Sequence, residues 1–422
     1  MTLSQQQLQR VKVIEKVVDG YVGIGAAAEL LNLSARQVKR LKKRYDPHSA
    51  AWVYHGNRGK PPLNRIAEDT RRQVVTLARG KYRGFNDSHL QEKLAAQENL
   101  SLSRPSVRRI LRQAGLASPQ KRRSPRYRSR RERREQEGAM LQTDGSRHDW
   151  LEGRGPWLTL LGFIDDATGK VPVARFQQDA EDTVGYLRLL RTLLEQVGVP
   201  LSIYRDQHGI FQRNDDHWSV AEQLQGEQFP TQAGRALQEL GIVSIPARTA
   251  QAKGRIERLW RTFQDRLCSE LRLAAATNLE QASHVLEQFL IQYNGKFPQP
   301  AKQALTAYRK LDRRLDLDYI LSLRYERKVN QDHTIALAPG VLIQLPRLQN
   351  GRGFAGKKVE VCQQPNGDWR TYLDRRLLHL QPAAPNAPAP RVLKTSRHRT
   401  PAKKKPLRIY TYAGRPAKGL GG

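Results

Sequence analysis

The sequence predicts a multidomain protein with small all-α units first, a central α/β core built on a mixed five-stranded sheet, and a small β-barrel toward the C-terminus. Three observations support this prediction. A length of 422 residues suits two to four domains. Helix-like and strand-like patterns occupy separate stretches of the chain. The net charge of +33, from 73 Lys and Arg against 40 Asp and Glu, indicates a polyanionic partner.

The first predicted unit, residues 1–55, contains two short helical patterns joined by a tight turn. Ser34 is the expected N-cap of the second helix. Arg36, Arg40 and Lys43 fall on one stripe of that helix, away from its apolar stripe. This arrangement is typical of a DNA-binding helix-turn-helix, although any two-helix hairpin with a solvated basic face would show it too. The charge of the whole chain favours DNA binding.

A second helix-turn-helix-like unit is predicted over residues 64–117, beyond a Gly- and Pro-rich linker. Its last helix has Ser103 as N-cap and Pro105 in the first turn. Residues 118–137 are interpreted as a basic linker that follows a DNA backbone, the alternative being a solvated linker. Residues 381–422 carry Lys and Arg but no acid, which predicts a disordered basic tail.

The central region, residues 138–275, has the pattern of the sheet. Strands are expected at 139–145, 157–166, 169–176, 201–207 and 242–248, and amphipathic helices at 182–198, 231–241 and 253–273. Three consecutive strands followed by alternating helices and strands imply a mixed sheet covered on both faces. In a sheet of this order the first and fourth strands are neighbours.

Two smaller regions complete the predicted organisation. A helical extension is expected over residues 276–322, with a pair of helices within 278–312. Strand patterns resume over residues 323–380, where Pro-Asn-Gly-Asp at 365–368 supplies a hairpin turn. We interpret this last region as a small β-barrel.

Three acids stand at informative places in the predicted core. Asp144 lies on the first strand, Asp206 ends the fourth, and Glu257 lies early in the helix that follows the fifth. Carboxylates that converge in a sheet repel each other unless cations neutralise them. Hard oxygen ligands of this kind suit Mg²⁺ or Mn²⁺. A pair of such ions promotes in-line displacement at phosphorus. A phosphodiester substrate matches the basic flanks.

Four stretches around these acids carry a family resemblance: QTDGSRHDW, GPWLTLLGFIDDATGK, YRDQHGIF and QAKGRIERLWRTFQDRL. They resemble the integrase-core DDE transposases of bacterial insertion sequences, the ISNCY group in particular, within the retroviral integrase superfamily. The resemblance covers roughly residues 10–380. It implies a ribonuclease-H-like core, with Asp144, Asp206 and Glu257 as the catalytic, metal-binding triad.

The resemblance also implies function and partners. A transposase of this family binds terminal inverted repeats, frees 3′-hydroxyls and joins them to target DNA, as a homodimer or higher oligomer on DNA. By the same match, Lys253 and Arg261 are expected to touch DNA phosphates. Two departures stand out. No cysteine precedes Cys268, which excludes the zinc module of retroviral integrases, and residues 214–228 form an insertion that contacts either DNA or a partner subunit.

Other residues have simpler interpretations. Asp165 and Asp166, the nearest competitors of Asp144, precede a hairpin and are expected to be turn formers. Trp157, Trp260 and Phe263 are expected to be core residues. No Gly-rich phosphate loop is present, so no nucleotide is implied.

The remaining expectations concern compartment and alternatives. Two cysteines make no disulfide framework, the start of the chain lacks a secretory signal, and no run of about 18 apolar residues predicts a membrane span. These features favour a soluble, cytoplasmic bacterial protein associated with the nucleoid. The alternatives to a transposase are a non-catalytic DNA-binding regulator and a nuclease of related fold.

Overall fold

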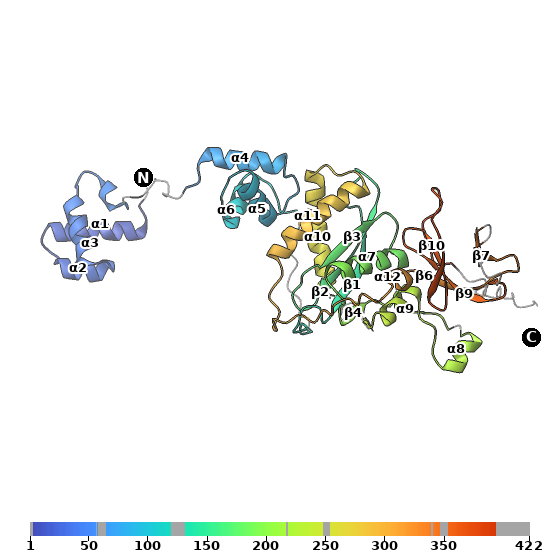
Figure 1. The fold of residues 1–422 in the computed structure, drawn as a ribbon. Helices are drawn as coiled ribbons and strands as arrows, with labels where there is room; N and C mark the ends of the chain where they lie inside the picture. The colour runs from blue at the N-terminus through green and yellow to red at the C-terminus, as the bar shows by residue number, and fades with distance from the viewer. Residues whose placement is uncertain are drawn as a thin grey trace, which may run out of the picture. The chain divides into compact units, whose positions relative to one another are not determined.

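The computed structural model describes residues 3–55, 57, 65–119, 131–216, 218–247, 254–338, 341–346 and 353–393. Its internal contacts divide the chain into two compact units, residues 1–73 and 74–422, which are described separately here (Figure 1). Within the described ranges, no helix combines the length and the apolar character that crossing a membrane requires.

The first unit is a bundle of short helices. These are α1 (Gln5–Val18), α2 (Ile24–Leu31), α3 (Ala35–Arg44) and the 3₁₀ helix η1 (Ala50–Val53). The hydroxyl of Ser34 accepts from the backbone N–H of Gln37, which confirms the predicted N-cap of α3. Val38 on α3 packs with Ile14 on α1, and both side chains are fully buried. The helix α1 was not among the predicted elements.

Three further helices form the predicted second helical group: α4 (Glu68–Arg79), α5 (Asp87–Gln97) and α6 (Arg104–Gln113). Ser103 caps α6 and Pro105 lies in its first turn, as expected. The apolar stripe of α6 is buried, which leaves its arginines at 104, 108 and 109 on the exposed side.

The central sheet is mixed and has five strands in the order β3-β2-β1-β4-β5. The strands are β1 (Leu141–His148), β2 (Leu158–Asp165), β3 (Val173–Gln177), β4 (Ser202–Arg205) and β5 (Val243–Pro246). β2 is antiparallel to β1 and to β3, whereas β4 runs parallel to β1 and to β5. The predicted adjacency of the first and fourth strands is confirmed, and the topology fits a ribonuclease-H-like core.

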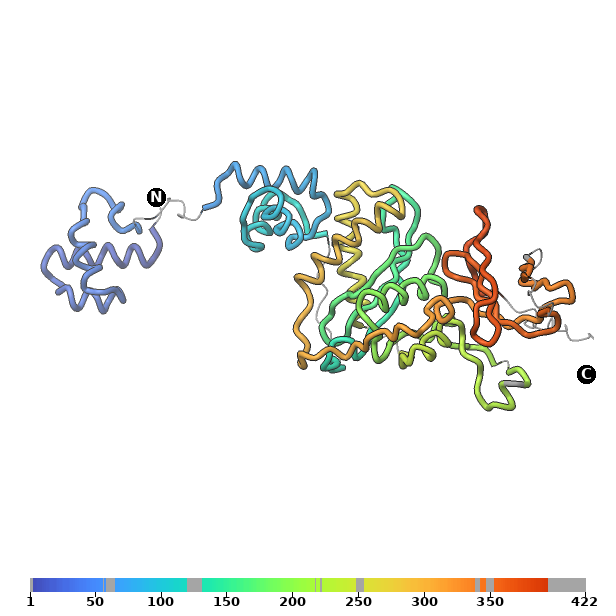
Figure 2. The backbone as a smooth tube through the Cα atoms, in the orientation of Figure 1, coloured from blue at the N-terminus to red at the C-terminus, as the bar shows by residue number. Residues whose placement is uncertain are grey.

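Helices cover both faces of this sheet, as the pattern predicted. On one face, Leu141 and Ile203 pack with α7 (Thr183–Gln196) and α9 (Gln232–Glu239). On the other, Leu158 and Leu160 pack with α10 (Gly254–Leu273) and α11 (Leu279–Lys296). Figure 2 draws the backbone of these elements as a tube, in the orientation of Figure 1.

Of the three aromatic residues predicted to lie in the core, two are buried and one is exposed. Trp260 and Phe263 are buried on the α10 side of the sheet, as expected. The prediction for Trp157 was wrong, because its side chain is 54% exposed at the residue before β2 begins. Both cysteines are buried free thiols.

The expected second helix of the 276–322 region does not form. After α11 the chain continues without a helix until the short α12 (Leu317–Ile320). Pro298 and Pro300 explain this, because proline lacks the N–H that a helix interior needs. The extended segment bonds to the core instead, with Arg309 and Val199 exchanging backbone hydrogen bonds of 2.9 Å.

The C-terminal strands form an open sheet rather than the expected barrel. β6 (Leu323–Lys328), β9 (Lys358–Gln363), β10 (Trp369–Leu373) and β11 (Arg376–Gln381) pair in the order β11-β10-β9-β6. β7 (Thr334–Ala338) and β8 (Val341–Gln344) make a separate hairpin. In the described residues β6 and β11 remain edges, so the sheet does not close. The predicted β9–β10 hairpin is confirmed.

Two segments interpreted as unstructured are partly tied to the fold. Residues 131–137 belong to the predicted basic linker, but Glu137 pairs with Lys170 at 3.0 Å and the side chain of Arg131 bonds to Asp166. At the other end, the backbone N–H of Leu393 donates to the hydroxyl of Tyr325 at 2.9 Å. The rest of the linker, residues 120–130, and the tail from residue 394 lie outside the described residues.

Candidate functional site

The strand β1 directs Asp144 toward helix α10. Successive side chains of a strand alternate between faces, and Leu141 packs on the α7 side. Asp144 therefore shares the opposite face with Ser146, whose hydroxyl accepts from Gln264 of α10 at 3.3 Å. Across the strand pair, Asp144 stands opposite Gly162. A Cβ at Gly162 would lie 3.0 Å from the Trp260 ring, so the helix packs closely beside Asp144.

Asp206 lies level with Asp144 on the neighbouring strand. The parallel register pairs Leu141 with Ile203 and Gln142 with Tyr204, an offset that also matches Asp144 to Asp206 just beyond the end of β4. Ile203 packs on the α7 face like Leu141, so the strand alternation also directs Asp206 toward the face of Asp144. Its carboxylate accepts from the backbone N–H of His208 at 3.0 Å, which shapes the turn after β4.

Tyr186 is influenced by the charges of both aspartates. This α7 residue is buried and donates a 2.8 Å hydrogen bond to Glu181. Its pKa is raised well above the ordinary value, first by burial, then by Glu181, and then by the charges of Asp144 and Asp206. Both aspartates therefore act on one group. Glu181 also lies near β1, because a Cβ at Gly145 would be 2.6 Å from its carboxylate.

Glu257 stands apart from the aspartate pair. It lies in the first turn of α10, seven residues before Gln264, and so on the helix stripe that faces β1. Its side chain is exposed. Among the described residues, no three His, Cys, Asp or Glu side chains gather closely enough to hold a metal ion. The structure thus brings Asp144 and Asp206 together and leaves Glu257 at the edge of the same face.

Of the two cationic residues expected beside Glu257, the structure describes only Arg261. Arg261 is exposed one turn further along α10. Lys253 lies outside the described residues. Gly254 begins α10, and no described atom lies within 4 Å of where its Cβ would be.

Asp165 and Asp166 are structural, and Asp166 does more than form a turn. Asp165 accepts from the backbone N–H groups of Gly138 and Thr168 at 2.8 Å each. Asp166 is fully buried and bonds to the side chains of Arg131 and Arg255 and to Gln142. Burial raises the pKa of Asp166, but its hydrogen bonds and these arginines outweigh burial and hold it below the ordinary value. This network joins β1, β2 and the start of α10.

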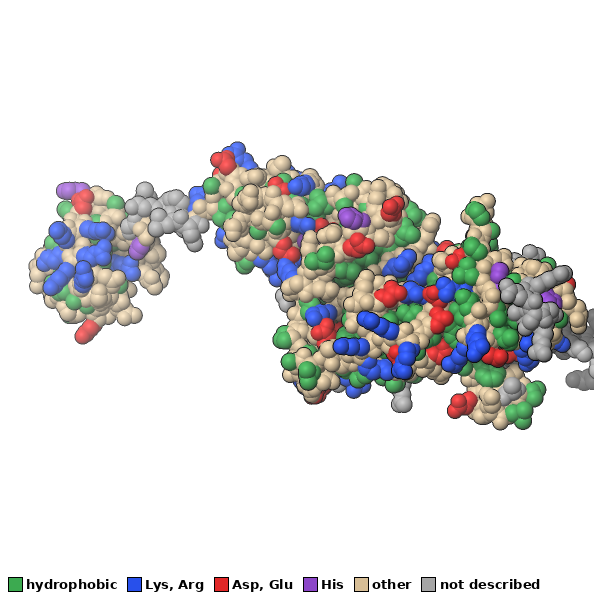
Figure 3. Space-filling model, viewed as in Figure 1, with side chains coloured by type: hydrophobic (Ala, Val, Ile, Leu, Met, Phe, Trp, Pro, Cys, Tyr) green, Lys and Arg blue, Asp and Glu red, His purple; other side chains and the backbone are tan. Residues whose placement is uncertain are grey.

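The predicted DNA-binding side chains of the first unit are all accessible. Arg36, Arg40 and Lys43 are exposed on α3, whereas Val38 on its other side is fully buried. Figure 3 shows Lys and Arg side chains gathered on the visible face of this unit. The turn between α2 and α3 contains Asn32 in the left-handed conformation, which tolerates asparagine well.

A polar seam that sequence reasoning missed fixes α5 against α10. Glu270 of α10 lies 2.6 Å from His89 Nε2 and 2.8 Å from Lys93 Nζ, in a mostly buried site. Burial raises the pKa of Glu270, but the bonds from His89 and Lys93 outweigh it and lower the pKa. Nearby, Arg266 bonds bidentately to Glu92 at 2.8 and 3.1 Å. The second helical group is therefore attached to the helix that carries Glu257.

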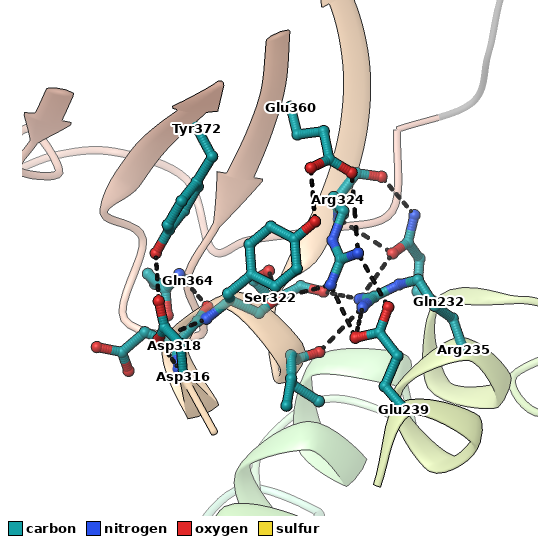
Figure 4. Close-up of polar contacts among 12 residues, drawn as sticks. Gln232, Arg235, Glu239, Asp316, Asp318, Ser322, Arg324, Glu360, Gln364 and Tyr372 are labelled. Atoms are coloured by element: carbon teal, nitrogen blue, oxygen red, sulfur yellow. Dashed lines mark hydrogen bonds and ion pairs between the residues drawn. The ribbon is translucent and has the colours of Figure 1, made fainter. Parts of the chain in front are cut away.

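A second polar seam attaches the C-terminal sheet to α9 (Figure 4). Arg324 of β6 donates to both carboxylate oxygens of Glu239, at 2.9 Å each, and its guanidinium stacks 3.6 Å from the centre of the Tyr319 ring. Arg235 of α9 donates to the backbone carbonyl of Ser322 at 2.6 Å. These fixed, charge-assisted contacts hold the sheet beside the core.

Two known proteins are similar to this chain over most of its length. A protein of Sinorhizobium fredii named "Putative transposase y4bF" is 36% identical over 368 residues, which cover 87% of this chain and 79% of that protein. The transposase for insertion sequence IS1202 of Streptococcus pneumoniae is 28% identical over 362 residues, covering 76% of this chain and 75% of that protein. No protein-family model matches the chain.

Solved structures show weaker likeness. The catalytic core domain of BIV integrase aligns over 38% of this chain and 85% of its own length, with 15% identity and a TM-score of 0.25. A chain of the simian T-cell lymphotropic virus intasome, solved in complex with the PP2A regulatory subunit B56 gamma, aligns over 74% of this chain and 99% of its own, with 15% identity and a TM-score of 0.30.

Proposed function

The chain belongs to the insertion-sequence transposases, the family of its two curated relatives, and from this premise we propose how it acts. It binds the terminal inverted repeats of its element, cleaves the DNA there, and joins the freed ends to target DNA. Asp144, Asp206 and Glu257 are the catalytic acids.

The matched register of Asp144 and Asp206 carries this proposal. Asp144 on β1 and Asp206 directly after the neighbouring parallel strand β4 follow the same register offset, and together they offer hard oxygen ligands to a divalent cation. The donor set therefore fits Mg²⁺ or Mn²⁺. Two such ions, when bound, supply an activated attacking oxygen and charge stabilisation for the leaving oxygen at phosphorus.

The chain's own residues set up this chemistry. Asp144 is fixed by its central strand and Asp206 by the turn that its carboxylate caps. Glu257 lies in the first turn of α10, on the stripe that faces them, and completes the triad when DNA is bound. The packing of Trp260 against Gly162 sets the position of this helix on the sheet.

DNA recognition is assigned to the basic surfaces. Arg36, Arg40 and Lys43 read the terminal repeat from α3, where exposed cations lie on one side of the helix. Arg261, with Lys253, contacts phosphates beside the acids. The net charge of +33 supports additional binding without sequence preference.

The test is to incubate the full chain with terminal element DNA, target DNA and Mn²⁺, and to separate the products on a denaturing gel. Joined strand-transfer products are expected. Nicks without joining would indicate a nuclease of related fold, and binding without cleavage would indicate a DNA-binding regulator. Either outcome contradicts the proposed function.

A further inference from the structure

The insertion between β4 and α9 folds as a separate excursion, residues 214–229, with the short helix α8 (Val220–Gln225) within it (Figure 2). Its base is closed, because the Thr231 hydroxyl donates to the backbone carbonyl of Ile210 at 2.7 Å. Gln228 also donates to the backbone carbonyl of Asp215 at 2.9 Å. The excursion is thus a closed loop rather than an extended connection.

The inside of the excursion is organised by a carboxylate. Glu222 is 1% exposed and accepts from the backbone N–H of Ser219 at 2.7 Å and of Phe229 at 2.8 Å. It also pairs with Arg213, which lies at the foot of the loop. These bonds fix the backbone without using the large apolar side chains of the segment.

Those apolar side chains point outward instead. Val220 is 73% and Leu224 is 83% exposed, and Trp218 and Phe229 are exposed as well. A loop with a buried carboxylate inside and large apolar groups outside is suited to burial against another surface, since aromatic and aliphatic residues of this kind form the centres of interfaces.

The charge of the excursion identifies the kind of surface. Residues 214–229 contain four acids, at positions 215, 216, 222 and 227, and no Lys or Arg, in a chain whose net charge is +33. Arg213 at the foot of the loop pairs with Asp215 and Glu222, and the excursion taken together with this arginine is still net negative. DNA phosphates would repel such a segment, whereas a basic protein surface would attract it. This chain itself offers such surfaces.

We propose that the excursion docks on a basic surface of a second copy of this chain, through Val220 and Leu224. Direct contact between two excursions is disfavoured because both are acidic. In a two-fold dimer each copy gives its excursion and receives that of the other, so the contacts close. This inference goes beyond the proposed function, and its main test uses neither DNA nor metal, so its failure is separate from failure of the transposase assignment.

The test is sedimentation velocity of the full chain over a concentration series. The wild type is expected to self-associate reversibly, and the double substitution Val220→Ser with Leu224→Ser to weaken association at least tenfold. Ile291→Ser is the matched control, because Ile291 is 68% exposed on α11 but outside the excursion, and it should leave association unchanged. A monomeric wild type, or equal association of all three proteins, would overturn the proposal.

Two further arms address the charge and the partner. Asp216→Asn with Glu227→Gln should reduce the salt dependence of association, and an unchanged salt dependence argues against docking on a basic surface. A photo-crosslinker placed at position 224 should join two copies of the chain when terminal DNA is also present. Crosslinks to the DNA, or only within one copy, would overturn the proposal.

Discussion

Two pairs of aspartates in the central sheet have opposite surroundings. Asp165 and Asp166 are buried and accept bonds from backbone N–H groups, Thr168 and two arginines. Asp144 and Asp206 are half-buried, and their negative charges act together on Tyr186. The first pair is held by the donors around it, which gives it a structural role, whereas we assign the second pair to a divalent cation because of its matched register across β1 and β4.

The largest expected effect is the loss of DNA cleavage and joining when Asp144 or Asp206 is replaced. Asp144→Asn or Asp206→Asn should reduce cleavage and joining about a thousandfold or more, because each removes charge that a divalent cation needs, worth several kcal/mol in the transition state. Glu257→Gln should behave alike, and binding to terminal DNA should persist in all three variants. Gel assays of cleavage and of binding measure both properties. Asp179→Asn, an exposed aspartate before α7, is the control, and an active Asp144→Asn variant would show that the triad is misplaced.

Asp166→Asn should lower the stability of the protein and leave its cleavage activity nearly unchanged. Removing one partner of a buried ion pair typically costs about 3 kcal/mol of unfolding free energy, and here Arg131 and Arg255 would lose their carboxylate. Cleavage per folded molecule should remain close to wild type. Chemical denaturation and the cleavage assay at low temperature measure the two quantities. A stable but inactive Asp166→Asn variant would reverse the roles given to the two pairs.

The pH dependence of this stability difference is a smaller effect with a defined sign. Because the folded pKa of Asp166 is lowered, its carboxylate stabilises the fold above the unfolded value of about 3.9, and that contribution is lost as pH falls through the folded pKa. The stability gap between wild type and Asp166→Asn should therefore be constant from about pH 7 to 5 and shrink below about pH 4. The pKa of Asp165, raised by burial, has the opposite slope, but it is common to both proteins. Denaturation at several pH values checks this, and a gap that widens in acid would contradict it.

The smallest effect concerns the first unit, which contains neither aspartate pair. Arg36→Ala or Arg40→Ala should weaken binding to the terminal repeat by about 1–3 kcal/mol for an arginine that meets a base edge, and relax discrimination against random DNA. Protein stability should not change, because both side chains are exposed. Binding titrations with repeat and random DNA provide the measurement. Unchanged affinity and discrimination in both variants would exclude α3 as the reader.

Local patterns predicted most of the elements and part of the candidate site. Strand periodicity placed Asp144 on β1 and Asp206 at the end of β4, and the order of elements predicted that these strands are neighbours. The register that brings Asp206 level with Asp144 was not predicted, because adjacency of two strands does not fix how they are offset. Capping residues such as Ser34 and Ser103 were predictable because a cap depends on only a few adjacent residues.

Contacts between distant residues were not predictable in the same way. The pairing of Asp166 with Arg255, or of Glu270 with His89, joins residues 89 and 181 positions apart, and no periodicity records it. The exposure of Trp157 was missed because composition does not say which apolar residues the core leaves out. The absent second helix near residue 300 was predictable from Pro298 and Pro300, whose effect outweighs the surrounding helical pattern.

The most direct test of the account is Mn²⁺ binding to the full chain, followed by electron paramagnetic resonance of free and bound ion, in the wild type, Asp144→Asn, Asp206→Asn and Asp166→Asn. We expect bound Mn²⁺ in the wild type and in Asp166→Asn under conditions where it remains folded, and a loss of binding in the other two variants. Retained binding in Asp144→Asn and Asp206→Asn, with loss in folded Asp166→Asn, would contradict the assignment of the two aspartate pairs.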